Sequence, residues 1–356
     1  MIVYLVLFII VILINSAPSY NRKVDNAKLA FSFILIFIFL AIRKNFGGDY
    51  NSYLDRFHFI KDYFEPFNFN TITTEPGYVV LNYILPSHRS LLIVTSAFTC
   101  FTYYWAIKRY VPVKYYGFVL TLILLFSSQM LFFQLSGLRN AIAINILILS
   151  TPLVIKRKFW SYISLAILAS LFHRSAILYM PIVYFVATPK DITKKDIYKW
   201  GIVALLFLSL SSTVFVNILK PLIDTYFNKY SAYLDHATEY QFSEISSILI
   251  LGFVGVFLTL SFLSIKNIDL TPTENVIFKL SLFYILSFAL NTLSPRGAQY
   301  FVTFFVLNTA FIISKVRKPI ITVLYIGATF LYAIYMITSF FADRYFLYEN
   351  YQTIFD

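Results

Sequence analysis

The stretch NRKVDNAKLAFSFILIFIFLAIRKNFGGDY, residues 21–50, decides the fold class of this chain. Its middle part, Ala30–Ile42, is an apolar run without the alternation of apolar and polar residues that the strands of a membrane barrel show. A helix satisfies its backbone hydrogen bonds internally, as hydrocarbon requires of any segment that crosses it. The run therefore predicts a transmembrane helix, preceded by basic residues and followed by a polar motif that contains two glycines.

Apolar runs of this kind recur along the whole chain of 356 residues. Hydrophobic residues make up 59% of the sequence and charged residues only 13%, whereas an average soluble domain has about 25% charged residues. We therefore expect an all-α, polytopic integral membrane protein with about twelve transmembrane helices, forming a single transmembrane domain over residues 1–356. The predicted spans are residues 2–17, 26–42, 89–107, 115–133, 138–155, 159–172, 174–187, 200–218, 245–264, 275–293, 298–314 and 319–341.

The Lys and Arg residues are divided unevenly between alternate turns. One set of turns holds clusters, with 17 of the 29 basic residues, and the other set holds 11 that mostly stand alone. Because Lys and Arg are enriched in cytoplasmic turns, we assign the clusters to the cytoplasm and both termini to the periplasmic side. In a soluble protein the net charge of +12 would indicate nucleic acid. Here the basic residues flank apolar runs, so we expect no nucleic-acid partner.

Two of the outward segments are long, residues 43–75 and 219–244. Each could form amphipathic helices on the membrane surface or re-entrant helices, either as a structural cap or as a substrate-binding element. Residues 76–86, bracketed by Pro76 and Pro86, are too few to cross the hydrocarbon core, and they predict an interfacial or re-entrant helix.

The turn Phe172-His173-Arg174-Ser175 separates two apolar runs of about fourteen residues each. At about 1.5 Å per residue such a helix spans about 21 Å, whereas the hydrocarbon core is about 30 Å thick. We therefore expect this turn to lie below the outer membrane surface, where an ionisable pair is costly unless it is paired or faces water. The alternative is a simple His-Arg turn at the interface.

Two arginines stand alone beside predicted spans. Arg139 opens the span that runs to Ile155. An arginine at an outward helix N-terminus adds a full positive charge to the exposed amides, and together they suit a phosphate or a diphosphate. Arg296, in the turn Ser294-Pro295-Arg296-Gly297, follows the same logic. The alternative for Arg139 is contact with lipid headgroups.

The motif Arg43-Lys44-Asn45-Phe46-Gly47-Gly48-Asp49-Tyr50 follows the second predicted span, and Glu75-Pro76-Gly77 ends the same outward segment. Gly47-Gly48 permits a tight turn with positive φ, which would bring Asp49 back toward Arg43. One interpretation is a structural clasp between these two side chains. The other is a site that binds sugar hydroxyls or accepts a proton.

Motifs of several other enzyme classes are missing. The sequence has no Asp-x-Asp pair for a metal-bridged nucleotide sugar and no His-x-x-x-His pair for zinc, and its four histidines are far apart in the chain. Walker-A and Gly-x-Gly-x-x-Gly patterns are also missing. We therefore expect neither a metal nor another cofactor.

Taken in order, these motifs resemble those of a known family. They read Arg43-x-x-x-Gly47-Gly48-Asp49-Tyr50-x-x-Tyr53, Glu75-Pro76-Gly77, Leu138-Arg139-Asn140-x-x-Ala143 and Phe172-His173-Arg174-Ser175-Ala176, with a weaker match at Arg296 followed by Tyr300-Phe301. The order is similar to that of the EpsG-type polysaccharide polymerases, which are related in role to the Wzy polymerases of O-antigen and capsule repeat units. Members of the family commonly carry Arg-Gln where this chain has Arg139-Asn140.

The resemblance implies a bacterial inner-membrane glycosyltransferase of GT-C-like architecture with its active site on the periplasmic side. Such enzymes join oligosaccharide units carried on undecaprenyl diphosphate, with one lipid-linked unit as donor and a hydroxyl of the next as acceptor. The implied partners are these lipid-linked oligosaccharides, the membrane lipids and a chain-length regulator protein.

Arginines can replace a metal ion in this chemistry, because they neutralise the charge that develops on the diphosphate leaving group. The first candidates for this role are Arg139 and Arg296, followed by Arg43 and Arg174. The other residues expected to contact the diphosphate or the sugars are Asn140, Tyr50 and Glu75.

The attacking sugar hydroxyl is a weak acid and is activated by a positioned base. The ordinary histidine pKa of about 6.5 suits that role at neutral pH. His173 is therefore the expected catalytic base, and Asp49 is the alternative. His173 could instead donate a hydrogen bond to the diphosphate.

Three other functions are compatible with parts of the pattern. A flippase or exporter of lipid-linked oligosaccharides would also have about twelve spans, but its charges would line a passage visible from both sides of the membrane. A membrane acyltransferase could use His173 as its base. An O-antigen ligase shares the chemistry of the polymerase and is the hardest function to separate from it.

Overall fold

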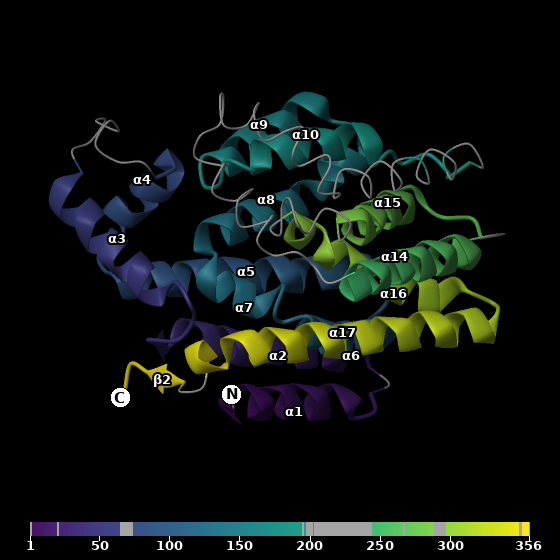
Figure 1. Cartoon of the computed structure of the whole chain (residues 1–356), viewed down its shortest axis with the longest axis horizontal. Helices are drawn as coiled ribbons and strands as arrows, with labels where there is room; N and C mark the ends of the chain where they lie inside the picture. The colour runs from purple at the N-terminus through teal and green to yellow at the C-terminus, as the bar shows by residue number, and fades with distance from the viewer. Residues whose placement is uncertain are drawn as a thin grey trace. The chain divides into compact units, whose positions relative to one another are not determined.

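The computed structural model describes residues 2–19, 21–64, 74–193, 196, 202, 244–265, 268–287, 297–348 and 351–355. These residues form helices joined by turns, together with two strands of two residues each (Figure 1). The predicted span 200–218 and the predicted outward segment 219–244 lie almost entirely outside the described residues.

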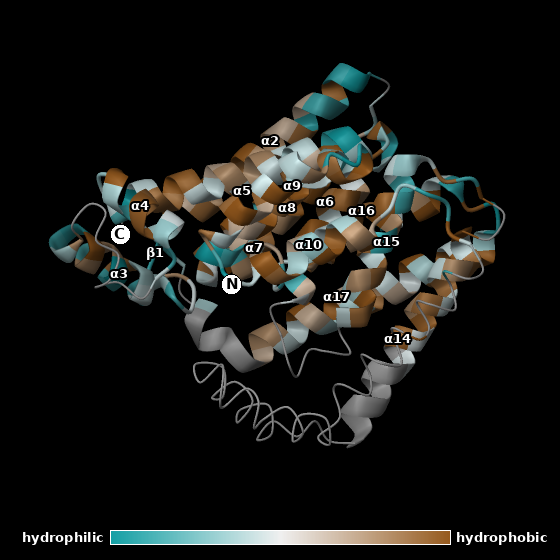
Figure 2. Cartoon of the chain, turned by 90° about the horizontal axis from the view of Figure 1, so that it is seen from above, coloured by the Kyte–Doolittle hydropathy of each residue, from teal (hydrophilic) through white to brown (hydrophobic). Residues whose placement is uncertain are grey.

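Four of the described helices are long and apolar enough to cross a membrane, judged by length and composition. They are α2 (Arg22–Ala41), α5 (His88–Tyr110), α8 (Leu138–Ile155) and the part Pro319–Ala342 of α17 (Pro319–Tyr348). Further apolar helices are α1 (Ile2–Ser16), α6 (Tyr116–Leu125), α9 (Phe159–Ser170), α10 (Ala176–Val186), α14 (Glu244–Ile265) and α16 (Val302–Lys315). Figure 2 shows how apolar residues dominate α2, α5 and α8. The helical, polytopic membrane class is confirmed, whereas the twelve spans, the GT-C-like architecture and the outward termini stay predictions.

The chain divides into two compact units. Unit 1 comprises Met1–Val186 and Thr329–Asp356, and unit 2 comprises Ala187–Ala328. In unit 2, α15 (Pro272–Ser287) packs against α14 and α16.

Lys279 of α15 lies within the predicted span 275–293. Its ammonium group is buried and donates to the carbonyl oxygens of Thr188 at 2.9 Å and Lys190 at 2.7 Å. These bonds satisfy the charge and tie residues 188–190 to α15.

In unit 1 the central helix is α8. It contacts α5, α9, α10 and the short α7 (Leu131–Ser136), and most of its residues are buried. α2 packs along α5, and α1 packs against α2 and α6. A helix that is apolar on nearly every side is typical of one enclosed by other helices, which matches the place of α8.

One predicted span, residues 115–133, is not a single helix. α6 ends at Leu125 and α7 begins at Leu131, with a turn between them. The turn contains Ser127-Ser128-Gln129. Short polar side chains of this kind compete for backbone hydrogen bonds and so favour a break in the helix. The apolar residues around them hid this break from the hydropathy pattern.

The outward segment between α2 and α5 folds into two helices, α3 (Tyr50–Tyr63) and α4 (Pro76–Ile84). One stripe of α3 is buried, formed by Tyr53, Phe57 and Ile60. This spacing by three or four residues makes α3 an amphipathic helix, as expected for the segment. α4 is the short helix expected between the two prolines.

Two short strands join distant parts of unit 1. β1 (Arg43–Lys44) directly follows α2 and pairs in antiparallel fashion with β2 (Gln352–Thr353), so that Arg43 lies opposite Thr353. The sequence did not predict this pairing. It places the polar motif after α2 and the end of the chain at the same end of unit 1.

Candidate active site

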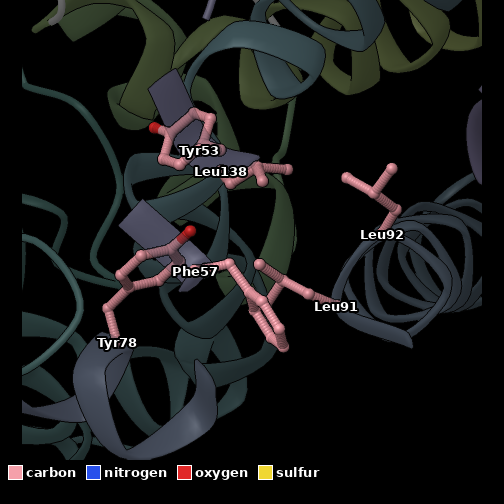
Figure 3. Close-up of a cluster of buried hydrophobic side chains, with 6 residues drawn as sticks. All are labelled: Tyr53, Phe57, Tyr78, Leu91, Leu92 and Leu138. Carbon is pink, nitrogen blue, oxygen red and sulfur yellow. The ribbon is translucent and has the colours of Figure 1, made fainter. Parts of the chain in front are cut away.

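The motifs of the outward segment are brought to the start of α8 by a cluster of buried side chains (Figure 3). Its members are Tyr53 and Phe57 of α3, Tyr78 of α4, Leu91 and Leu92 of α5, and Leu138 of α8. Fully burying a large apolar side chain stabilises a fold by about 1.5–3 kcal/mol. The cluster therefore fixes α3 and α4 against the N-terminal ends of α5 and α8.

Gly77 permits a close contact between α4 and the end of α9. Its backbone N–H donates to the carbonyl oxygen of Leu171 at 2.8 Å. A Cβ atom at this position would lie only 2.9 Å from that oxygen, so no other residue fits without a shift of the backbone. Pro76 is suited to the first turn of α4, where no backbone donor is needed. The motif Glu75-Pro76-Gly77 thus places Glu75 beside the turn that follows α9.

Glu75 lies between Arg139, one of the two first candidates for the diphosphate, and His173, the expected catalytic base. The guanidinium of Arg139 donates to Glu75 Oε2 at 2.5 Å. On the other side, His173 Nδ1 lies 3.8 Å from Glu75 Oε1. The side chains are 8% exposed for Glu75, 17% for His173 and 28% for Arg139, so the pairing is largely shielded from solvent. Three motifs that are far apart in the sequence therefore meet at one carboxylate.

The electrostatic environment keeps Glu75 ionised. Burial alone would raise the pKa of Glu75. The positive charge of Arg139, hydrogen bonds and the nearby His173 together outweigh burial, so the pKa lies below its ordinary value. Tyr78 lies close by, with its ring 5.9 Å from that of Tyr53, and burial raises the pKa of its hydroxyl. At neutral pH the site therefore contains a carboxylate and a neutral phenol.

The turn that carries His173 connects two short helices, as expected. α9 has 12 residues and α10 has 11, which corresponds to about 18 Å and 16 Å. Both lengths fall short of a hydrocarbon core of about 30 Å. The depth of this turn in a membrane stays a prediction.

Arg43 forms a second buried polar position. It is 2% exposed, and one terminal nitrogen donates to the carbonyl oxygen of Leu40 at 2.5 Å. Burial lowers the pKa of Arg43 to about 10, although the surrounding tyrosines Tyr50, Tyr351 and Tyr348 act to raise it. Arg43 is therefore still charged at neutral pH.

The turn after Arg43 forms as predicted. Gly47 has φ of +109°, and Asp49 is the residue directly before α3. Asp49 is exposed, unlike Glu75, and Tyr50 is partly buried. The structure therefore brings Tyr50 toward Arg43 and leaves Asp49 at the surface.

Two further predicted residues, Arg174 and Asn140, do not join the Glu75 group. Arg174 is exposed, although it follows His173 directly. Asn140 is buried, and neither its amide nitrogen nor its amide oxygen has a hydrogen-bond partner among the described residues. Arg296 lies outside the described residues. Within the described part of the chain, no three His, Cys, Asp or Glu side chains are close enough to hold a metal ion.

Sequence reasoning missed His88 and a set of hydroxyl groups on α5. His88 is buried and meets the ring of Tyr50 edge-on at 5.3 Å. Thr95, Ser96 and Thr99 lie on one face of α5 and line a recess together with Arg43. Their spacing by one and four residues within an apolar helix is a signal that could have marked this face in advance.

The comparisons with known proteins agree with the arrangement of motifs. No curated protein and no solved structure matches the chain. A family model described as the EpsG family matches residues 26–353, a range that includes all the motifs above. Membership in that family indicates a membrane-embedded protein with a polysaccharide polymerase-type, glycosyltransferase-like function. The chain belongs to the EpsG family.

Proposed function

We propose that this protein joins undecaprenyl-diphosphate-linked oligosaccharide repeat units on the periplasmic face of the bacterial inner membrane, by metal-independent glycosyl transfer. The product would be an O-antigen, a capsule or an exopolysaccharide. Family membership supports the polymerase class. The position of Glu75 between Arg139 and His173 is the single observation that carries the chemistry.

In this proposal His173 is the general base. Glu75 accepts a hydrogen bond from Nδ1–H, which fixes the tautomer and leaves Nε2 with a lone pair for the acceptor hydroxyl. The separation of 3.8 Å is longer than a hydrogen bond, and catalytic hydrogen bonds often shorten when substrate binds. A carboxylate in this position also stabilises the imidazolium that forms when His173 takes a proton.

The reaction then balances as a single displacement. The proton of the acceptor hydroxyl passes to His173 Nε2 while the hydroxyl oxygen forms a bond to the anomeric carbon of the donor. The bond from that carbon to the phosphate oxygen breaks, and its electron pair leaves with undecaprenyl diphosphate. Direct displacement inverts the configuration at the anomeric carbon.

Arg139 would have two tasks. Its contact with Glu75 keeps that carboxylate ionised and in place. Its guanidinium also has further donors in a fixed fork, and its side chain is 28% exposed, so it can meet the diphosphate as well. Arg174 and Arg296 stay candidates for the same leaving group, and Asn140, Tyr50 and Asp49 stay candidates for contacts to the substrate.

The test is polymer formation in cells that make the repeat unit. His173→Ala, Glu75→Gln and Arg139→Ala should each abolish long-chain polymer, while a single repeat unit still reaches the surface. His58→Ala is the matched control, since His58 is an exposed histidine of α3, and it should give a normal ladder of polymer lengths.

Three outcomes would contradict the proposal. Normal polymer ladders from both His173→Ala and Arg139→Ala would show that neither residue is needed for polymerisation. Lipid-linked units trapped in the cytoplasmic leaflet would indicate a flippase. Normal polymer that is not transferred to its final lipid would indicate an O-antigen ligase.

A further inference from the structure

A small polar recess lies in unit 1 beside the start of α8. Its polar lining consists of Arg43, Thr95, Ser96, Thr99 and Gln134. The apolar lining is formed by Leu40, Leu135, Leu138, Ala141 and Ile142. The free space at its centre is about that of one water molecule. The recess can therefore take a single oxygen-sized group, and a sugar ring would not fit.

Arg43 brings a positive charge to this recess, whose lining contains no acidic side chain. In the described part of the chain, no carboxylate forms an ion pair with Arg43, and its Nε atom is buried without a hydrogen-bond partner. Arg139, in contrast, is paired with Glu75. A buried charge without a partner is costly, and an anion that completes it would lower this cost.

The floor of the recess is held in a fixed arrangement by hydrogen bonds. Asn145 Nδ2 donates to Thr99 Oγ1 at 3.0 Å, Thr99 donates to Gln134 Oε1, and Gln134 Nε2 donates to the Tyr103 hydroxyl at 2.8 Å. Ser96 forms no hydrogen bond through its hydroxyl to any described residue, so that donor is available. Arg43 and Ser96 are thus two donors beside a floor in which the side chains of Thr99 and Gln134 already bond to each other.

The recess also adjoins the proposed catalytic group. Leu138 lines the recess and belongs to the cluster that holds α3 and α4 against α8. Arg139, which contacts Glu75, is the next residue along the chain.

We propose that this recess binds one phosphoryl oxygen of the undecaprenyl diphosphate carrier, with the Arg43 guanidinium and the Ser96 hydroxyl as donors. The identity of the carrier rests on the proposed function, whereas the phosphate chemistry rests on the recess alone. A planar guanidinium with several donors suits phosphate oxygens, and a small recess without a carboxylate does not repel them. None of Thr95, Ser96, Thr99 or Gln134 was selected by the sequence analysis.

The test is ligand binding by the purified full chain in detergent, measured by thermophoresis without any turnover. The wild-type protein should bind undecaprenyl phosphate and should not bind undecaprenol, which has the same chain without phosphate. Arg43→Gln should weaken binding about tenfold to a hundredfold, the effect expected for a lost charge-assisted hydrogen bond, and Ser96→Ala by about fivefold. Arg89→Gln is the matched control, because Arg89 is exposed and the charge change is the same, and it should leave binding unchanged.

A second variant of Arg43 separates weaker binding from a folding defect. Arg43→Lys keeps the positive charge but loses the planar set of guanidinium donors. It should bind undecaprenyl phosphate more weakly than wild type while eluting as the same monodisperse species. Wild-type affinity in both Arg43→Gln and Arg43→Lys would overturn the proposal, and so would equal binding of undecaprenol. If phosphatidylglycerol competes as strongly as undecaprenyl phosphate, the assignment of the ligand as the undecaprenyl carrier is overturned, and the recess is a site for phospholipid headgroups.

The binding result and the polymer result are independent. If Arg43→Gln binds normally and His173→Ala loses polymer, the recess proposal fails and the proposed function stands. If Arg43→Gln loses binding and His173→Ala makes normal polymer, the phosphate site stands and the proposed function fails.

Discussion

Replacing Tyr351 tests how the end of the chain holds the motif that follows α2. The ring of Tyr351 stacks on Phe39 with centroids 4.8 Å apart, and it meets Phe46 edge-on at 4.9 Å. Its hydroxyl donates to the carbonyl oxygen of Phe39 at 2.6 Å. β2 begins directly after Tyr351 and pairs with β1, which contains Arg43. We therefore expect this tyrosine to fasten the strand pair.

The size of the effect follows from the lost contacts. Tyr351→Ala removes two aromatic contacts of about 1 kcal/mol each and one hydrogen bond of about 1 kcal/mol. The free energy of local opening at β1 should fall by about 3 kcal/mol, which corresponds to about 150-fold more frequent opening. Tyr351→Phe removes the hydroxyl alone, so opening should become about fivefold more frequent.

Hydrogen exchange of the purified protein, followed by mass spectrometry on peptides that cover residues 39–50, measures this opening directly. Tyr335→Ala is the matched control, because Tyr335 of α17 is 62% exposed and should not affect exchange at β1. Unchanged exchange over residues 39–50 in Tyr351→Ala would refute the reasoning. Equal acceleration in Tyr335→Ala and Tyr351→Ala would do so too, since it would show a general loss of stability.

Two further predictions concern the Glu75 motif. Gly77→Ala should cost about 1–3 kcal/mol of stability, because the added Cβ would lie 2.9 Å from the carbonyl oxygen of Leu171. Gly327→Ala is the control and should cost none, since nothing lies within 4 Å of its added Cβ. Thermal unfolding in detergent compares the two variants, and equal melting temperatures would contradict the close contact at Gly77. The pKa of Glu75 is lower in the folded protein than its ordinary value, so its pairing with Arg139 adds stability above that value and loses it as the pH falls through the folded pKa. Wild type should therefore melt above Glu75→Gln at pH 7, and the difference should shrink as the pH falls below the ordinary glutamate pKa of about 4.3; a constant difference at every pH would exclude the ion pair as the cause.

The helices could largely be predicted from hydropathy, because each depends on local composition. α2, α5 and α8 begin and end close to the predicted bounds, and α3 and α4 occupy the outward segment where helices were expected. The break between α6 and α7 was missed, since three polar residues inside an apolar run have little effect on an averaged pattern. The strands β1 and β2 are too short to carry a periodic signal.

The candidate site was only partly predictable. Single arginines and a His-Arg turn stand out in an apolar sequence because charge is costly there, so Arg139, His173 and Arg43 could be selected. Their partners could not be assigned, because pairing depends on which helices approach each other. Glu75 was expected to contact substrate, which stays a prediction, and its position between Arg139 and His173 was not foreseen. Arg43 was considered for a clasp with Asp49, and the structure places it beside a recess of α5 hydroxyls.

The sequence by itself therefore determined the membrane class, most helix bounds and the family, because each of these depends on residues close together in the chain or on their order along it. Only the tertiary structure decided which arginine is paired with an acid and which is not. That difference arises from packing: the buried cluster of Tyr53, Tyr78 and Leu138 holds α4 against the start of α8 and so brings Glu75 to Arg139. The end of the chain pairs with β1 over a separation of about 300 residues, where no local pattern records the contact.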